Sequence, residues 1–214
     1  GGGGAVGVDA EGRAKGYGGP AVFEGIGFHV AGGERLLIMG LNGAGKTSLL
    51  KILADVLRAD AGSFRLGHGV SLGYYAQEHE GIRDGESVLA HVRAESLDAS
   101  DQDLRGLLGM FGLIGPVAFQ DAGTLSGGEK TKLALAQLVA GRRNLVLLDE
   151  PTNNLDPPSR TAVAEALAGW SGSMVLVSHD VEFVRALSPH KVLMMPDGEL
   201  AFWDDELLGL VALA

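Results

Sequence analysis

Residues 125–156 read LSGGEKTKLALAQLVAGRRNLVLLDEPTNNLD, and this stretch decides the fold. A Ser-Gly-Gly turn precedes a run with helical apolar spacing, which predicts an amphipathic helix near Gly128 to Ala140. The apolar run from Leu145 to Leu148 predicts a buried strand. That strand ends in two adjacent carboxylates, Asp149 and Glu150.

A phosphate-binding loop lies upstream, because residues 40–47, GLNGAGKT, fit G-x-x-x-x-G-K-[ST] at every fixed position. A strand is predicted before it at Arg35 to Met39 and a helix after it at Lys46 to Leu57. Glycines let successive backbone N–H groups converge on phosphate oxygens, and the helix N-terminus adds partial positive charge. Lys46 can reach the β- and γ-phosphates, and the Thr47 hydroxyl can bind Mg²⁺. The expected nucleotide-binding residues of this loop are Asn42, Gly43, Ala44, Gly45, Lys46, Thr47 and Ser48.

The two carboxylates have separate expected roles. Ligands bind at the carboxyl edge of open parallel sheets, which is where Asp149 and Glu150 stand. We expect Asp149 to hold the Mg²⁺ shell and Glu150 to polarise the attacking water as a general base. The alternative is that both acids merely solvate the end of a strand. The phosphate loop upstream favours the first interpretation.

The remaining pattern alternates strands with helices, which predicts an α/β fold with a mostly parallel sheet and helices on both faces. Helices are predicted at Ser159–Trp170 and Val181–Leu187, and strands at Ala21–Val30, Met174–Val177 and Lys191–Met195. Strands are also predicted within Gly62–Tyr75, around a Gly67-His68-Gly69 turn, and a hairpin or helix from Glu199 onward. We expect one nucleotide-binding domain at residues 17–214 with a helical insert at about residues 78–124. The Gly-rich residues 1–16 are expected to form a flexible lead-in or to be the remnant of an interdomain linker.

Composition excludes several classes of protein. A chain of 214 residues with 46% hydrophobic residues forms one large domain or two small ones, and its zero cysteines exclude disulfides and thiolate metal sites. The net charge of −10 argues against a nucleic-acid surface over the whole domain. Arg142 and Arg143 form a small basic patch, which we interpret as a solvated helix end. Without a signal peptide in residues 1–15 or an apolar run of membrane-spanning length, a cytoplasmic location is expected.

These motifs resemble those of the ATP-binding cassette (ABC) ATPases over nearly all of residues 17–214. The matching segments are the Walker A loop at 40–47, the signature LSGGE at 125–129, Walker B at 145–150 and the D-loop NNLD at 153–156. The resemblance also identifies Gln77 as the Q-loop glutamine, His179 as the switch histidine and Tyr17 as the aromatic that stacks on adenine. It implies the fold of a P-loop NTPase cassette, with an antiparallel β subdomain and a helical insert.

The resemblance further implies that two cassettes pair head to tail, with each ATP between the Walker A loop of one and the signature of the other. Ser126, Gly127 and Gly128 open a helix, so they can present a hydroxyl and N–H groups to the partner's nucleotide. The implied catalytic residues are Glu150, His179 and Gln77, and the implied Mg²⁺ ligands are Thr47, Gln77 and Asp149. His179 also lies in a Ser-His-Asp sequence, but no G-x-S-x-G nucleophile elbow accompanies it.

The branch of the family is indicated by fewer residues. The paired Asn153-Asn154, the YYAQEH stretch at 74–79 and the C-terminal tail resemble ABC-F proteins, which carry two cassettes on one chain and act on the ribosome. The resemblance implies the second, C-terminal cassette of a translation or ribosome-protection factor, in some members linked to antibiotic resistance. Its expected partners are a second cassette, in the same chain or in a homodimer, and the ribosome, without membrane insertion. Two alternatives stay open: the ATP-binding subunit of a membrane transporter, and a nucleotide-binding clamp with little turnover.

Overall fold

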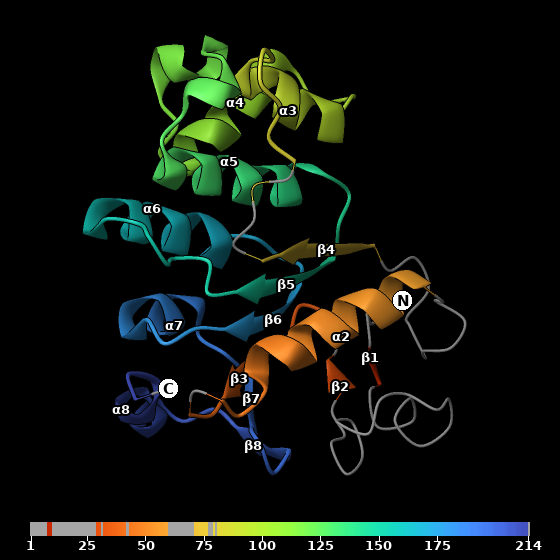
Figure 1. Ribbon diagram of the computed structural model, residues 1–214, viewed down its shortest axis with the longest axis vertical. Coiled ribbons are helices and arrows are strands. Elements are labelled where there is room, and N and C mark those ends of the chain that lie inside the picture. Colours follow the sequence, from red (N-terminus) through yellow and green to blue (C-terminus); the bar gives the residue numbers. More distant parts are fainter. Residues whose placement is uncertain are drawn as a thin grey trace.

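A computed structural model describes residues 8–9, 29–30, 32–41, 43–59, 71–76, 79 and 81–213. Within these ranges the core is a six-stranded sheet in the order β4-β5-β6-β3-β7-β8 (Figure 1). The strands are β3 (Arg35–Met39), β4 (Leu72–Tyr75), β5 (Leu145–Asp149), β6 (Ser173–Val177), β7 (Lys191–Met194) and β8 (Glu199–Phe202). Neighbouring strands are parallel except at the β7–β8 edge. A separate antiparallel pair joins β1 (Val8–Asp9) to β2 (His29–Val30). The strand β1 falls in residues 1–16, the expected lead-in.

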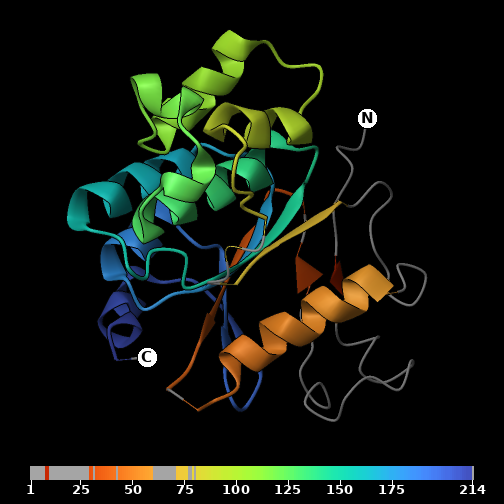
Figure 2. The ribbon, with the colours of Figure 1, turned by 45° about the horizontal axis from the view of Figure 1, so that its top comes forward.

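Helices cover both faces of the sheet, as the alternating pattern predicts (Figures 1 and 2). They are α2 (Lys46–Ala59), α3 (Val88–Glu95), α4 (Asp101–Met110), α5 (Gly127–Ala140), α6 (Pro157–Ala168), α7 (Val181–Leu187) and α8 (Leu208–Val211). Short 3₁₀ turns occur at Gly115–Phe119, Ala122–Thr124 and Asp205–Leu207. None of the described helices is long and apolar enough to cross a membrane.

Alternate residues of the central strand β3 serve opposite faces of the sheet. Leu36 and Ile38 pack with α2, whereas Leu37 and Met39 belong to the larger cluster on the other face. The α2 side contributes Leu49, Leu50 and Leu53, each at most 1% exposed. Burying such a side chain is worth about 1.5–3 kcal/mol, so this face anchors the helix that follows the phosphate loop.

The helical insert packs on α5 and lies on the side of α5 remote from the sheet (Figure 1). Ser87 and Ser100 cap α3 and α4 by accepting hydrogen bonds from backbone N–H groups three residues later. Val88, Leu104 and Phe111 of the insert are fully or almost fully buried. The insert is therefore a small helical layer held to the rest of the domain through α5.

Element boundaries agree with the sequence prediction to within about two residues. The helix predicted at residues 159–170 begins at Pro157, because Asp156 accepts a hydrogen bond from the Ser159 N–H and a proline suits the first helical turn. It ends at Ala168 instead of Trp170. The strand predicted to end at Leu148 includes Asp149, which pairs with Val177 of β6. The turn at residues 67–69 and most of the strand predicted at residues 21–30 lie outside the described residues.

A partly buried arginine ties two helix C-termini to the central strand. Arg35, the first residue of β3, donates to the carbonyl oxygens of Ala168, Trp170 and Leu187 at 2.6–3.1 Å. These carbonyls lie at or just beyond the ends of α6 and α7, where the helix dipole favours a cation. Burial lowers the pKa of the Arg35 guanidinium, which nevertheless stays charged at neutral pH.

Candidate functional site

The order of the strands places the predicted motifs side by side. β5, β6 and β3 are neighbours in the sheet, and all three run in the same direction. Their carboxyl ends carry the Asp149–Glu150 pair, His179 and the loop at residues 40–47. In the chain these segments are separated by about 30 to 130 residues, so only the parallel pairing makes them one site.

The phosphate loop has the backbone geometry that glycine permits. Gly40, Gly43 and Gly45 have φ angles of +152°, +87° and +93°. A Cβ at Gly40 would lie 2.7 Å from the Met195 carbonyl oxygen, so a side chain there would clash with the backbone after β7. Ala44 donates its N–H to Leu41 O at 3.0 Å, which closes the turn.

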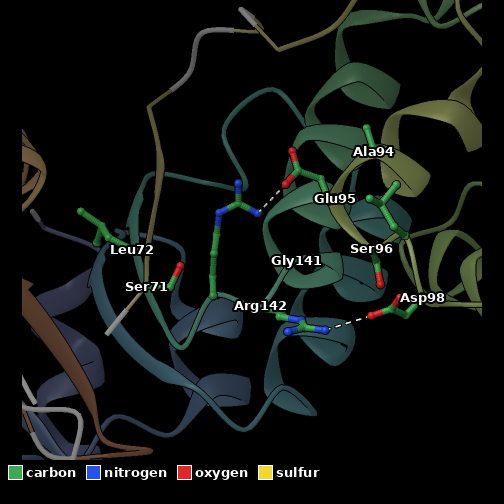
Figure 3. A pocket seen from close by; sticks show the side chains of 10 residues that line it. Ser71, Leu72, Ala94, Glu95, Ser96, Asp98, Gly141 and Arg142 are labelled. Atoms are coloured by element: carbon green, nitrogen blue, oxygen red, sulfur yellow. Dashed lines mark hydrogen bonds and ion pairs between the residues drawn. The ribbon is translucent and has the colours of Figure 1, made fainter. Parts of the chain in front are cut away.

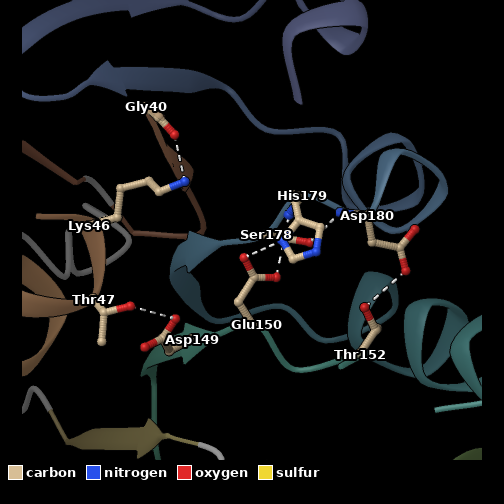
Figure 4. Close-up of polar contacts among 9 residues, drawn as sticks. All are labelled: Gly40, Lys46, Thr47, Asp149, Glu150, Thr152, Ser178, His179 and Asp180. Carbon is tan, nitrogen blue, oxygen red and sulfur yellow. Dashed lines mark hydrogen bonds and ion pairs between the residues drawn. The ribbon is translucent and has the colours of Figure 1, made fainter. Parts of the chain in front are cut away.

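Lys46 opens α2 and turns back over this loop. Its Nζ donates to the Gly40 carbonyl oxygen at 2.6 Å, and the residue is only 9% exposed (Figure 4). A buried ammonium close to a glycine-rich loop and a helix N-terminus fits an anionic ligand. Thr47 and Ser48 follow on the first turn of the helix, and both are exposed.

Thr47 and Asp149 meet across the end of the sheet. The Thr47 hydroxyl donates to Asp149 Oδ1 at 3.4 Å, and Asp149 is 6% exposed (Figure 4). Burial raises the pKa of Asp149, against the opposing effects of the Thr47 hydrogen bond and the Lys46 charge. A buried carboxylate beside a hydroxyl is an oxygen donor set that fits Mg²⁺, whose charge would offset the cost of burying the anion.

Glu150 and His179 form a short polar contact at the end of β5. His179 Nδ1 lies 2.6 Å from Glu150 Oε1, and the His179 backbone N–H donates to Oε2 at 3.4 Å (Figure 4). Glu150 has a φ of +49°, while its own N–H donates to Val177 O at 2.8 Å. A non-glycine residue in this region is strained, and such strain clusters at functional sites. The backbone bond to Val177, the left-handed conformation of Glu150 and the contact with His179 together fix the orientation of the Glu150 carboxylate.

A further polar contact, missed in the sequence, ties the two loops together. The Thr152 hydroxyl donates to Asp180 Oδ2 at 2.9 Å, and the other carboxylate oxygen accepts the Phe183 N–H and caps α7 (Figure 4). The S-H-D-x-x-F pattern contains a helix cap, but nothing in the sequence pairs it with Thr152. This contact links the turn after Glu150 to the turn after His179. A cavity of about 300 Å³ lies beside it and reaches both Glu150 and Arg160.

The Ser-Gly-Gly turn is a capped helix start. Ser126 Oγ accepts the Glu129 N–H at 3.2 Å, and Glu129 Oε1 accepts the Ser126 N–H at 3.0 Å. This capping box holds the turn that opens α5, in which Gly127 is exposed and Gly128 is half-buried. The cap uses a lone pair of Ser126 Oγ, so its hydroxyl hydrogen can still be donated to another molecule.

Three of the predicted site residues, Tyr17, Asn42 and Gln77, lie outside the described residues, so their roles stay predictions. The strand that leads toward Gln77 ends at Tyr75, next to β5. A cavity of about 510 Å³ lies between this strand end, α2 and α5, and Thr47 and Asp149 contribute to its wall.

The basic patch at Arg142 and Arg143 has local acidic partners. Arg142 contacts Asp98 at 2.9 Å and Arg143 contacts Glu95 at 3.0 Å, at the rim of a cavity of about 560 Å³ (Figure 3). Both side chains of the Arg142 pair are more than 85% exposed. The Arg142 pair fits the interpretation of a solvated helix end, whereas the side chain of Arg143 is only 23% exposed and also donates to Gln137 O at 3.2 Å.

Comparison with known proteins finds a matching family and relatives of similar sequence. The model of the family described as "ABC transporter" matches residues 23–153. The probable ATP-binding protein YheS of Escherichia coli is 42% identical over 174 residues, which are 81% of this chain and 27% of that protein. The probable ATP-binding cassette sub-family F member 3 homolog of Encephalitozoon cuniculi is 36% identical over 90% of this chain and 34% of its own length. The chain thus spans only about a quarter to a third of these relatives.

Solved structures show the same fold. A dimeric ATP-binding cassette in a post-hydrolysis state, bound to ADP and Pi, has a TM-score of 0.64 at 19% identity, covering 83% of this chain and 88% of that one. A putative metal-chelate type ABC transporter in an inward-facing conformation has a TM-score of 0.65 at 23% identity, covering 94% of this chain and 84% of that one. The mostly parallel sheet flanked by helices is therefore that of a nucleotide-binding cassette.

Proposed function

Because this chain belongs to the ABC family of ATP-binding cassettes, we propose that it binds Mg-ATP and hydrolyses it when a second cassette completes the site. Lys46 and the backbone N–H groups of Gly43, Ala44 and Gly45 bind the phosphates. Asn42 and Ser48 flank this cradle, and Tyr17 stacks on the base. Thr47 and Asp149, with Gln77, would hold the Mg²⁺, which would supply positive charge to offset that of the phosphates.

The contact between Glu150 and His179 carries the proposal of hydrolysis. Glu150 accepts a proton from the attacking water, and His179 orients the Glu150 carboxylate through the contact of 2.6 Å. A group that only clamps nucleotide needs no oriented base beside a phosphate loop, so this geometry supports turnover over a passive clamp. General-base catalysis of this kind contributes about 10²–10⁴-fold in rate.

The signature turn supports the proposal that a second cassette completes the site. Ser126, Gly127 and Gly128 form a helix start whose first two residues are exposed, and it suits the γ-phosphate of a nucleotide bound by another cassette. The relatives are roughly 2.7 to 3 times as long as this chain, which leaves room for such a cassette in the same polypeptide. A second copy of the domain is the alternative source.

The ABC-F branch is the part of the proposal that rests on sequence. The relative from Encephalitozoon cuniculi is named as a member of sub-family F, and its identity of 36% extends over 90% of this chain. The paired Asn153-Asn154 and the YYAQEH stretch support the same branch. On this basis the full-length protein acts on the ribosome as a translation or ribosome-protection factor, with the ribosome bound mostly outside this chain.

The test of hydrolysis is Glu150→Gln in the full-length protein, which removes the base and keeps the shape of the side chain. We expect kcat to fall by about 100-fold or more while ATP still binds. The matched control is Glu165→Gln on the exposed side of α6, which should leave kcat within about twofold of wild type. Turnover that survives Glu150→Gln would favour the nucleotide-binding clamp.

The test of the ribosome assignment uses the same variant. With ATP, the Glu150→Gln protein should accumulate in its ATP-bound form and sediment with ribosomes, whereas Lys46→Ala, which weakens phosphate binding, should not. Co-purification with a membrane subunit, and no protein in the ribosome fraction, would favour the transporter alternative.

A further inference from the structure

Two side chains from the segment around Gln77 converge on one hydroxyl of α5. Tyr75 donates its O–H to Thr131 Oγ1 at 3.4 Å, and His79 Nε2 lies 3.0 Å from the same oxygen. Tyr75 and His79 stand two residues before and two residues after Gln77 in the chain. The hydroxyl of Thr131 therefore holds both ends of the five-residue stretch that contains the expected Mg²⁺ ligand.

The hydroxyl has the capacity for both bonds. A threonine oxygen can accept through two lone pairs and donate one hydrogen, so Tyr75 uses one lone pair. With an unprotonated Nε2, the Thr131 O–H donates to His79, and with a protonated Nε2, the oxygen accepts from it. Thr131 is 3% exposed and Tyr75 is 4% exposed, so breaking these bonds would leave buried polar atoms without partners.

Thr131 lies on the helix that begins with the signature turn. It is the fifth residue of α5, whose cap is Ser126. Ala134 and Gln137 follow at helical spacing and line the cavity of about 510 Å³ together with Tyr75, Ala76 and Gly81. Thr47 and Asp149 line the same cavity. One face of the signature helix thus shares this cavity with two of the expected Mg²⁺ ligands of the domain's own nucleotide.

We propose that Thr131 is a positioning residue, which fixes the signature helix to the segment around Gln77 and so holds Ser126–Gly128 in the orientation that serves the partner's nucleotide. The inference rests on the proposed function and deepens it, because it names the contact between the half of the site that binds one nucleotide and the half that serves the partner's. The hydroxyl has no contact with nucleotide in this role. Its loss should affect turnover more than binding.

A core role alone would not need the hydroxyl. Valine has nearly the same shape as threonine and would fill the same space, but it cannot bond to Tyr75 or His79. If Thr131 only packs, Thr131→Val should change thermal stability and leave both kcat and KM near their wild-type values. If it positions α5, kcat should fall while nucleotide affinity holds.

The experiment measures steady-state ATPase kinetics, binding of a fluorescent ATP analogue and thermal unfolding of the full-length protein. For Thr131→Val we expect kcat to fall about tenfold, with KM and analogue affinity within about twofold of wild type, and Thr131→Ser to restore kcat to within about threefold. Thr161→Val is the matched control, because within the described part of the chain the exposed Thr161 hydroxyl bonds to Pro157 O of its own helix.

Double-variant cycles supply the second measurement. Tyr75→Phe and His79→Leu each remove one bond to Thr131, so each should lower kcat, and adding Thr131→Val should lower it no further. If Thr131→Val does not fold, the two single variants decide, and unchanged kcat in both overturns the proposal. Additive losses, an unchanged kcat in Thr131→Val, or failure of Thr131→Ser to restore it would also overturn it. Wild-type turnover in Glu150→Gln would instead overturn the proposed hydrolysis.

Discussion

His179 Nδ1 lies 2.6 Å from Glu150 Oε1, although the two residues belong to different loops and are 29 positions apart in the chain. The parallel pairing of β5 with β6 brings them together, since each residue follows the end of one of these strands. The side chain of Glu150 is 16% exposed and that of His179 is 48% exposed, so the histidine shields one side of the carboxylate from water.

His179→Ala should therefore impair catalysis without impairing nucleotide binding. With its orienting partner gone, Glu150 samples other rotamers, and we expect kcat to fall about 100-fold while ATP affinity stays within about threefold. His179→Gln, which can still donate a hydrogen bond, should lose less. Measured kcat and KM of the full-length protein check this, and a parallel loss of ATP affinity in both variants would speak against a positioning role.

Asp149→Asn should stabilise the nucleotide-free and Mg²⁺-free protein at neutral pH. Burial raises the pKa of Asp149 in the folded state, so the folded protein binds this proton more tightly than the unfolded chain does. This tighter proton binding adds to the free energy of unfolding. The gain is complete below the ordinary Asp pKa of about 3.9 and is lost as the pH rises through the folded-state pKa. The neutral amide avoids that loss.

The measurement is the melting temperature as a function of pH. The advantage of Asp149→Asn should be largest near pH 7 and shrink as the pH falls toward about 4. With Mg-ATP the order should reverse, because the variant lacks a charged Mg²⁺ ligand. The control is Asp55→Asn at an exposed position of α2, and a pH-independent advantage of Asp149→Asn would contradict the expectation.

Ser126 allows the capping of α5 to be separated from its expected action on the partner's nucleotide. Ser126→Asp keeps an efficient N-cap but places a negative charge at the turn, so stability should hold while ATPase activity collapses. Ser126→Ala loses the cap and should cost about 1 kcal/mol of unfolding free energy, with a smaller loss of activity. Denaturant unfolding and ATPase assays on the same samples check both, and an active Ser126→Asp protein would exclude close approach of a phosphate.

Arg35→Met should be among the most destabilising changes of a charged residue. Three carbonyl oxygens at or beyond the ends of α6 and α7 would lose their donor, so we expect a decrease of about 2–4 kcal/mol in unfolding free energy. Arg142→Met, which breaks the exposed pair with Asp98, should cost less than about 0.5 kcal/mol. Equal effects of the two changes would contradict this account.

Much of the fold could be predicted from local patterns. The strand Arg35–Met39 and the helix Val181–Leu187 have the predicted bounds, because apolar periodicity and capping residues act over a few neighbouring positions. The start of α6 differs by two residues, because a prediction from apolar spacing overlooks a cap at Asp156. In the site, the phosphate loop and the two carboxylates follow from motif and position at a strand end.

The remaining features depend on contacts between distant segments. No local pattern predicts the left-handed conformation of Glu150, the pairing of Thr152 with Asp180 or the convergence of Tyr75 and His79 on Thr131. Each joins residues brought close by the order of strands in the sheet or by the packing of α5 beside it. Such proximity is a property of the closed fold.

The sequence by itself determined which groups are present: the phosphate loop, the carboxylate pair, the signature turn and the membership of the cassette family that they indicate. Local geometry suffices for these, since a Gly-rich turn, a helix cap and a buried apolar strand are each encoded within about ten residues. Only the tertiary structure decided which groups face one another. Parallel strands in the order β5-β6-β3 set Glu150 against His179 and Thr47 against Asp149, because hydrogen-bonded register joins positions that the chain keeps far apart.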